Sequence, residues 1–463
     1  MATGHNLVVG LKKNANTWGT GLAVLAGAGD GIEVDSESLA IDAQLIENVG
    51  LFGQGTQRPS KLGEKLLAGD LPCPLYYVGL ETAVALAMGA TGGAPSQLGG
   101  TTAYELSILL AASLAGEHST IAMGGVDHPS VREIAFSKGN GFTFDFQRNQ
   151  LAKLTLPQVG YDLFNNVGAP DPDLVVVAVE PTDVTLTIAA QPSHPSFLTI
   201  TVTDSDTSIT EYIVTITGLD DDGNYATETY TLSSDGLTWT SSIRWSSITA
   251  LVGSGLAGTA TSDTIEVGVQ PGVNNVNTYT SITVPTTADY ELVAFDQVRI
   301  WMNEQSAGAL DLTASTDEFF MDAIRVTLNP SLVQNVTTRF GNRVEEPHAG
   351  DFKKVELGFN FPSWDSANNA LLRDRLLGKK FKVHIRAQGP LADTGFPLEW
   401  SIWLNEVQFG TGSPNAGGPG DIRFDLTGMA HRAIVNPTGL PSWANQQPIA
   451  LRNVSLRTTD PLA

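Results

Sequence analysis

The clearest pattern in the sequence is an alternation of β-branched and polar residues through its middle part. Residues 197–204 read FLTITVTD, with apolar side chains at every second position, and residues 209–219 continue the same period. More alternating segments follow, separated by turn signals such as Asp-Asp-Asp-Gly-Asn at 220–224. This pattern is typical of a small β-sandwich. We therefore predict that residues 166–275 form a sandwich inserted between two flanking regions.

The two flanking regions share one order of patterns, namely a strand, a long polar loop, a second strand and a helix. The first loop covers residues 51–63 and leads to a predicted helix over residues 79–90. The second loop covers residues 340–350 and leads to a predicted helix over residues 365–380. This faint internal repeat favours two related units. The predicted organisation is a first copy over 1–165, the sandwich over 166–275 and a second copy over 276–463.

The second helix has clear start and stop signals. Asp365 or Ser366 can cap its first turn, and Gly378 stands where a helix usually ends. Leu372 and Leu376 are four residues apart, so we expect both on the buried face.

Further strands complete each flank. In DIRFDLTG the apolar and polar residues alternate strictly, so one face of the strand is expected in the core and the other in water. The two sets are Ile422, Phe424 and Leu426 against Arg423, Asp425 and Thr427. The predicted fold class is mainly β, a β-rich α+β protein with two half-barrel or sandwich domains, each with a flanking helix, plus the inserted sandwich.

Composition narrows the classes of function. The 463 residues carry 26 Lys and Arg against 49 Asp and Glu, for a net charge of −23. Such a surface argues against reading nucleic-acid sequences or docking on anionic membranes, because both need a basic patch. One cysteine, Cys73, excludes an intrachain disulfide framework and a cysteine zinc site. No apolar run approaches the length of a membrane span, and the start of the chain predicts no targeting signal.

Catalytic and metal-binding signatures give no positive prediction. Residues 27–31, GAGDG, are glycine-rich but have the wrong spacing for a dinucleotide loop. The pairs Glu117-His118 and Asp127-His128 lie in polar turns, so both histidines are expected in solvent. The acidic run at 220–222 resembles part of a calcium loop but lacks its spacing and closing glutamate, which favours a hairpin turn. We predict no enzyme, no cofactor and no metal.

The long loops concentrate basic residues in a chain that has few of them. The first, over residues 51–65, contains Arg58, Lys61 and Lys65, and the second, over residues 339–354, contains Arg339, Arg343, Lys353 and Lys354. Basic loops on an acidic body can pair with another copy of the chain. They can equally be ordinary loops whose charges face water, since exposed charges contribute little by themselves. Both interpretations stay open.

Several stretches resemble the tail tube proteins, or major tail proteins, of long-tailed bacteriophages. The resemblance is carried by residues 34–41 and 104–164 of the first flank and by residues 298–332, 345–361 and 421–432 of the second. Residues 216–269 are similar to the Ig-like modules common in phage structural proteins. The matches are weak individually but occur in a consistent order over most of the chain.

The resemblance implies an assembly. In that family, tube domains with two orthogonal sheets join side by side into a continuous inner β-barrel, and an early loop reaches the neighbouring ring. That loop corresponds to residues 51–65 here, and to 340–354 in the second copy. Two domains per chain suit a trimeric ring with pseudo-sixfold symmetry, whereas one would suit a hexamer; the repeat favours the trimer. The candidate ring-to-ring contacts are Phe52, Arg58, Lys61, Lys65, Arg339, Arg343 and Lys353.

The implied partners are other copies of the chain and the tail's tape measure, terminator and baseplate or tip proteins. Double-stranded DNA would pass through the lumen during ejection without sequence-specific binding, because an acidic wall offers phosphates few cations. The expected location is the virion tail, after assembly in the host cytoplasm, with no membrane insertion. The sandwich would decorate the exterior.

Two rival functions remain. The first is an adhesin on a phage or cell surface, in which aromatic residues of the sandwich stack on sugars. The candidates are Tyr212, Tyr225, Tyr230, Trp239 and Trp245, whose alternation also fits the core and rim of a sandwich. The second is an enzyme such as a wall hydrolase, for which the sequence supplies no recognisable acid pair or metal site.

Overall fold

A computed structural model describes most of the chain and confirms that it is mainly β. Strands make up 56% of it, with two helices and several antiparallel sheets. The described residues are 8–18, 23, 25, 30–48, 58–124, 131–165, 171–192, 196–220, 223–233, 238–260, 262–269, 291–312, 317–336, 344–415, 422–441 and 446–463. Neither helix in these ranges has the length and apolar character needed to cross a bilayer.

The elements follow one another as three groups along the sequence. The first group is β1 (Val8–Lys13), β2 (Gly31–Ile32), β3 (Ala40–Asn48), β4 (Arg58–Pro74), α1 (Glu81–Met88), β5 (Gly89–Thr91), β6 (Ser96–Gln97), β7 (Tyr104–Leu110), β8 (Ser119–Gly124), β9 (Arg132–Gly139), β10 (Phe142–Gln147), β11 (Lys153–Gly160) and β12 (Leu163–Asn165). The second is β13 (Asp171–Val179), β14 (Thr199–Thr203), β15 (Glu211–Asp220), β16 (Tyr225–Ser233), β17 (Thr238–Thr240), β18 (Trp245–Ala257) and β19 (Thr264–Val269). The third is the short 3-10 helix η2 (Phe295–Gln297), β20 (Val298–Glu304), β21 (Glu318–Phe319), β22 (Ala323–Asn329), β23 (Leu332–Val333), β24 (His348–Ala349), β25 (Lys354–Phe361), α3 (Ser366–Leu376), β26 (Phe381–Asp393), β27 (Phe396–Asn415), β28 (Arg423–His431) and β29 (Ala450–Ser455).

The first and third groups are joined through one large antiparallel sheet. Backbone pairing links β3, β4, β11, β10, β22, β25, β28 and β27 in that order. The connection between the flanks is therefore the β10–β22 ladder, which runs in register from Phe142 opposite Leu328 to Gln147 opposite Ala323. A second connection pairs β29 with β7.

One hydrophobic core underlies this sheet and draws on both flanks. The Phe144 ring lies 6.2 Å from that of Trp400, and Trp400 donates its indole N–H to the carbonyl of Tyr76 at 2.8 Å. The amide of buried Asn453 likewise donates to the carbonyl of Tyr77 at 2.8 Å. Hydrogen bonding of these buried polar groups fixes how the two flanks pack, because a buried donor without an acceptor is costly. The predicted boundaries near residues 166 and 275 adjoin undescribed stretches and stay predictions.

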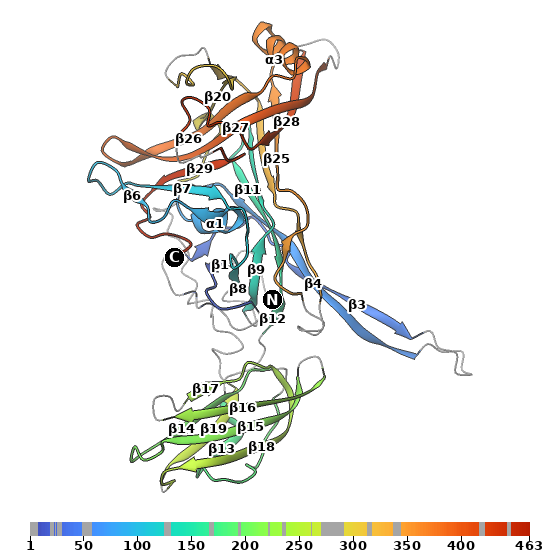
Figure 1. The fold of residues 1–463 in the computed structure, drawn as a ribbon, viewed down its shortest axis with the longest axis vertical. Helices are drawn as coiled ribbons and strands as arrows, with labels where there is room; N and C mark the ends of the chain where they lie inside the picture. Colours follow the sequence, from blue (N-terminus) through green and yellow to red (C-terminus); the bar gives the residue numbers. More distant parts are fainter. Residues whose placement is uncertain are drawn as a thin grey trace.

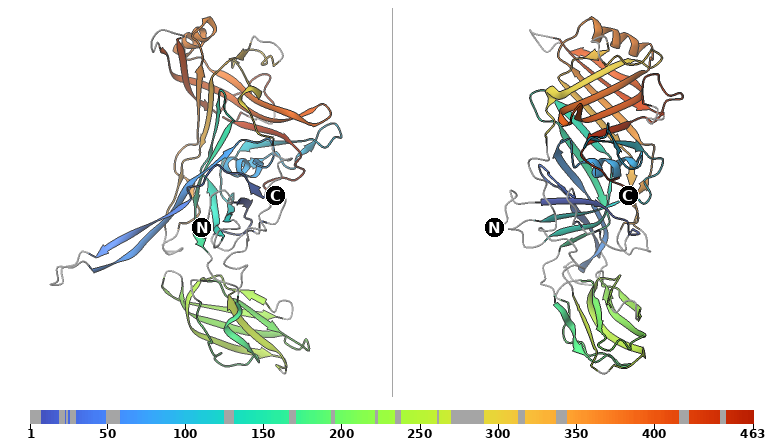
Figure 2. Two further views of the ribbon diagram at one scale, coloured as in Figure 1. Left: turned by 180° about the vertical axis from the view of Figure 1, so that it is seen from behind. Right: turned by 90° about the vertical axis from the view of Figure 1, so that its left-hand side faces the viewer.

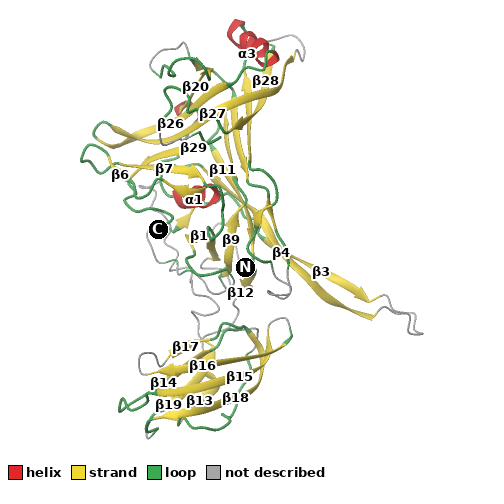
Figure 3. Ribbon diagram, in the orientation of Figure 1, coloured by secondary structure: helices red, strands yellow, loops and turns green. Residues whose placement is uncertain are grey.

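Both predicted helices are present, and they differ in their surroundings (Figure 3). α1 is buried along its whole length under the first group of strands. α3 lies at the far end of the molecule and ends before Gly378, whose φ of 67° confirms the expected stop. The predicted Leu372 and Leu376 face is wrong in part. Leu371 is buried and Leu372 packs on the core, but Leu376 is 73% exposed, so the apolar face of α3 is formed by Leu371 and Leu372.

The middle group forms a sandwich with its own core. A four-stranded sheet, β13–β19–β14–β17, faces a three-stranded sheet, β16–β15–β18. Ile200 from the first and Val214 from the second meet in one buried cluster around Trp245. The predicted hairpin at 220–224 is confirmed, since Leu219 pairs with Tyr225 across it.

The molecule is elongated, with two features that project from its body (Figures 1 and 2). The sandwich lies at one end of the long axis and α3 at the other. The β3–β4 ribbon leaves the body sideways and extends well beyond any other strand. An outstretched ribbon and a terminal module both offer surface to neighbouring molecules.

Candidate assembly interface

The β3–β4 ribbon replaces most of the long loop predicted at residues 51–65. Residues 58–65 belong to β4 and pair with β3, from Asn48 opposite Arg58 to Ala43 opposite Lys65. The expectation of a loop here is wrong because cross-strand pairing overrides the low strand propensity of Pro59 and its polar neighbours. Only residues 51–57, which carry Phe52, lie outside the described part of the chain.

In the described residues, no third strand pairs with the outer half of the ribbon. β4 pairs with β11 from Leu67 to Pro74, whereas its segment from Arg58 to Leu66 pairs, in the described chain, with β3 alone. A two-stranded ribbon is marginally stable by itself, and its outer edges present unpaired backbone groups. We call this outer half of the ribbon, residues 43–48 of β3 and 58–65 of β4, the arm. The backbone of Arg58, Lys61 and Lys65 lies on this arm, so three of the predicted contacts share one strand.

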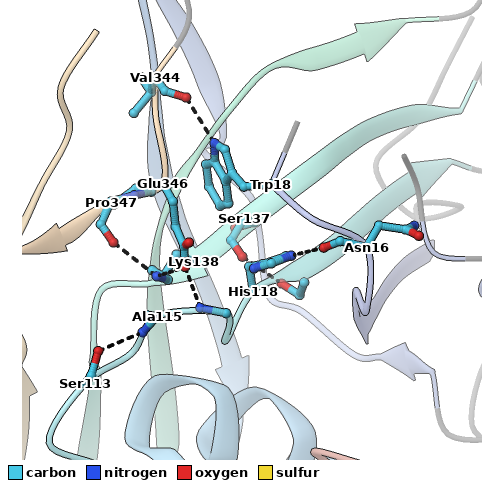
Figure 4. A network of polar contacts seen from close by, with 12 residues as sticks. Asn16, Trp18, Ser113, Ala115, His118, Ser137, Lys138, Val344, Glu346 and Pro347 are labelled. Carbon is cyan, nitrogen blue, oxygen red and sulfur yellow. Dashed lines mark hydrogen bonds and ion pairs between the residues drawn. The ribbon is translucent and has the colours of Figure 1, made fainter. Parts of the chain in front are cut away.

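The second long loop behaves differently, because its described end is held against the first flank. The indole N–H of Trp18 donates to the carbonyl of Val344 at 3.1 Å. Lys138, only 1% exposed at its side chain, donates to Glu346 at 2.7 Å and to the carbonyl of Pro347 at 3.1 Å (Figure 4). The segment after Val344 is therefore a strap and not a free arm.

The predicted contact residues of this loop divide accordingly. Arg339 and Arg343 lie outside the described residues. Lys353 turns inward and donates to the carbonyl of Ala111, and burial lowers the pKa of its ammonium group. Lys353 is thus engaged within its own chain, and Lys354 begins β25 with an ion pair to Asp351.

The Lys138–Glu346 pair carries the electrostatic part of this anchor. Burial lowers the pKa of Lys138, and the bond from Glu346 opposes that shift. Burial also raises the pKa of Glu346, but its bonds to Lys138 and to the backbone N–H of Gly116 outweigh burial and leave that pKa below its ordinary value. The two groups form an ion pair at 2.7 Å, and each depends on the other for compensation of its charge.

Replacement of Glu346 by Gln is expected to lower the free energy of unfolding by about 2–3 kcal/mol at pH 7, since Lys138 keeps its buried charge without a counter-charge. Urea unfolding measures the loss. The folded-state pKa of Glu346 is depressed, so the pair's contribution is present above pH 4.5 and is lost as the pH falls through the folded value. Glu345→Gln, one residue away, is the matched control. Equal stability of the two variants would contradict the anchor.

The prediction that His118 lies in solvent is wrong. It is 4% exposed, its Nε2 lies 2.9 Å from the carbonyl of Asn16, and its ring packs edge-on against Trp18 and Phe136. Burial lowers its pKa. No local pattern near His118 indicates this burial, because Trp18 reaches it only through the tertiary fold. His128 lies outside the described residues, as do residues 27–29 of the glycine-rich segment.

A broad polar face, which the sequence reasoning did not locate, spans five strands from both flanks. It belongs to β10, β22, β25, β28 and β27 and encloses an open hollow of about 1020 Å³. We call it the five-strand face. Register places its side chains in three rows across the strands. The rows are Gln147–Ala323–Asn360–Asp425–Ser413, Asp145–Arg325–Gly358–Thr427–Thr411 and Thr143–Thr327–Glu356–Met429–Gln408.

The alternation that builds this face is the signal that could have revealed it. Phe142, Phe144 and Phe146 of β10 point into the core, and the residues between them point out. The prediction for β28 is confirmed for Phe424 and Leu426, which are buried, while Ile422 before the strand is 37% exposed. Each strand taken alone shows an ordinary amphipathic pattern. Only the inter-strand register, which the sequence does not give, assembles the polar halves into one surface.

Charges on the five-strand face are sparse and mostly engaged. Arg325 pairs with Asp145 at 2.7 Å, and Asp425 accepts a hydrogen bond from the amide of Asn360. Glu356 adds a further carboxylate. At one end of the face, Arg148 pairs with Asp322 at 3.1 Å. Arg325 and Arg148 are therefore neutralised by carboxylates, whereas the exposed Arg423 lies beside Arg148 at the end of the face.

The aromatic residues proposed for an adhesin are mostly part of the sandwich core. Tyr212 and Trp245 are fully buried. Tyr230 and Trp239 stack on each other at 4.5 Å and pack against the core, which leaves Tyr225 as the exposed ring of the five. A sugar platform needs several exposed rings on one surface, so this arrangement weakens that alternative.

Comparisons with known proteins give distant structural similarities. No family model matches the chain, and no curated protein matches its sequence. Among solved structures it is similar to a chain of the virion of a native gene transfer agent particle, at 12% identity and a TM-score of 0.21 over 30% of this chain and 93% of that one. It is also similar to a chain from the tail of the empty particle, determined with C6 symmetry, at 14% identity and a TM-score of 0.19. That match covers 31% of this chain and 97% of the other. A third similar structure is the SPP1 Dit (gp 19.1) protein, described as a paradigm of the hub adsorption apparatus in phages that infect Gram-positive bacteria. The identity is 14% and the TM-score 0.22, over 51% of this chain and 92% of that one.

Proposed function

We propose that this chain is a structural subunit of the tail tube of a phage or a related gene-transfer particle. Three copies form a ring whose five-strand faces line a channel, and rings stack into a hollow tube through which DNA passes. The observation that carries this proposal is the five-strand face itself. It is broad, it carries mostly polar side chains with few lysines and arginines, and a continuous apolar core supports it from behind.

The outer strand of the five-strand face, β27, supports the proposal that rings close by strand pairing between chains. The segment Gln408–Asn415 of β27 pairs with β28 on one side. In the described residues no strand pairs with its other side, although Arg375 of α3 donates a hydrogen bond to the carbonyl of Gly410 at 3.3 Å. A free edge of this kind can pair with a neighbouring chain, and closing a barrel removes such edges altogether. Within the chain, the β10–β22 ladder already joins the two flanks in this manner. Three chains would repeat the arrangement around the ring.

Stacking of rings is assigned to the β3–β4 arm. No third strand pairs with this arm within the described residues, and it carries Arg58, Lys61 and Lys65 on a chain with a net charge of −23. An arm that docks on the acidic surface of the next ring gains both backbone pairing and charge complementarity. Head-to-tail contacts of this kind produce filaments when their rotation does not close. The contacts of Phe52, Arg339 and Arg343 remain part of the proposal.

The sandwich is assigned to the outside of the tube. It contains fourteen acidic residues and one basic residue between 166 and 275, and it lies at the end of the molecule away from α3. An acidic module of this kind keeps particles soluble and repels other polyanions. The experiment that tests the proposal is electron microscopy with mass measurement on the purified chain. Rings of three 49.0 kDa chains, about 147 kDa each, stacked around an open channel are expected.

A further inference from the structure

Strand register in the sandwich brings two aspartates together. β14 pairs with β19 up to Thr203 opposite Thr264, so the next residue on each strand is Asp204 on one and Asp263 on the other. Asp206 follows in the turn after β14. One carboxylate oxygen from each of these three residues lies within 4.8 Å of the others. The arrangement thus joins the β14–β15 turn to the β18–β19 turn.

The buried member of this group lacks a partner for one of its oxygens. Asp263 is 2% exposed, and its Oδ1 accepts hydrogen bonds from the backbone N–H and the hydroxyl of Ser205 at 2.7 and 2.8 Å. Its Oδ2 is buried and accepts no hydrogen bond. A buried carboxylate oxygen without a donor is strongly unfavourable unless a cation compensates it. This orphaned oxygen is the observation that points to a ligand.

The described residues supply no cation to the group. Within the part of the chain that the structure describes, none of the three carboxylates forms an ion pair with Lys or Arg. The whole segment 166–275 contains a single basic residue, Arg244. Asp204 accepts the backbone N–H of Ile209 at 2.9 Å, which holds its carboxylate beside the others but leaves their mutual repulsion in place. Three adjacent carboxylates without a positive charge are the arrangement that a divalent cation resolves.

We propose that Asp204, Asp206 and Asp263 bind a calcium ion that ties the β14–β15 turn to the β18–β19 turn of the sandwich. Calcium takes six to eight oxygen ligands at about 2.3–2.6 Å, so oxygens on opposite sides of it can stand roughly 5 Å apart. The three carboxylate oxygens lie within 4.8 Å of one another, so all of them can reach one such ion. Magnesium needs shorter and more regular bonds. Backbone carbonyls and water would complete the coordination.

The proposal is tested by isothermal titration calorimetry. The full-length chain is first treated with a chelator to remove bound metal and is then titrated with calcium. We expect one ion per chain and weaker binding of Mg²⁺. Asp206→Asn is the decisive variant, because Asp206 is exposed and its replacement leaves the sandwich core intact. It is expected to weaken calcium binding at least tenfold. Asp183→Asn is the matched control, since Asp183 accepts the N–H of Leu256 in the same sandwich but lies outside the group.

Three results would overturn the assignment. They are no calcium binding up to 10 mM, equal affinity in Asp206→Asn and Asp183→Asn, or magnesium binding as tight as calcium. Far-UV circular dichroism of each variant verifies that the fold is retained, so a loss of binding cannot be assigned to unfolding. Tube assembly plays no part in these readouts. The calcium site and the proposed function therefore stand or fall separately.

Discussion

A chain in which residues 43–65 are replaced by an Asn-Gly turn is expected to fold but not to polymerise. The cut removes the β3–β4 arm and keeps the pairs from Asp42–Leu66 to Ala40–Ala68. Leu67, which is buried in the core, is retained. The body therefore keeps its core, whereas rings lose the arm proposed to hold their neighbours. The fraction of protein that sediments as assembled tubes should fall from most of the sample to the background level.

Reversing the charges on the arm tests whether assembly needs its basic side chains or only its backbone. Arg58→Glu with Lys61→Glu is expected to give soluble protein that does not form tubes, because the arm would then meet an acidic partner with acidic side chains. Arg432→Glu with Arg457→Glu is the matched control, with the same change of charge outside the arm. Normal tubes from the truncated chain would remove the arm from the account. Failure of the control pair to assemble would mean that net charge alone governs polymerisation.

Lysine at the centre of the five-strand face is expected to make assembled tubes retain DNA. Gly358 occupies the middle of the central row, and a Cβ there would meet only the Cβ of Arg325 at 3.9 Å, an ordinary contact. The fold can thus accept a longer side chain. Combining Gly358→Lys with Glu356→Gln removes the adjacent carboxylate, so each chain presents an unpaired cation to the channel. Repetition along a tube should raise affinity for DNA at least a hundredfold, with a steep loss between 50 and 200 mM salt.

The measurement is co-sedimentation of short duplex DNA with tubes, followed by nuclease digestion. DNA held inside a channel is expected to resist digestion, whereas DNA on an outer surface is cut. Gly358→Gln with Glu356→Gln is the control, because it has similar bulk and no added cation. Retained DNA that is fully digested would place the five-strand face on the outside. No gain in retention over the control would show that the face does not meet DNA.

Local patterns predicted the elements that depend on local physics. The helices over 79–90 and 365–380, the alternation around Phe424 and the hairpin at 220–224 all follow from periodicity and turn residues, and all are present. The arm was expected as a loop because Pro59 and Gly63 argue against a strand, and the pairing with β3 that overrides them is a tertiary effect.

The candidate sites depended on contacts between distant segments. His118 was placed in solvent because nothing near it in the sequence announces Trp18. Asp204 and Asp263 meet only through the β14–β19 register, so a sequence pattern points to the contiguous acidic run at 220–222 and not to this group. The five-strand face required the register of four ladders. Sequence pattern gives the two sides of each strand, but the order and offset of strands come from packing.

Negative-stain electron microscopy of the purified full-length chain, with mass photometry of the same sample, tests the central claim most directly. The account predicts hollow tubes built from rings of three chains, about 147 kDa per ring, with projections from the sandwich on the outside. A single closed ring that does not stack would favour a hub over a tube. Chains that remain at 49.0 kDa at every concentration, or particles without a central channel, would contradict the account.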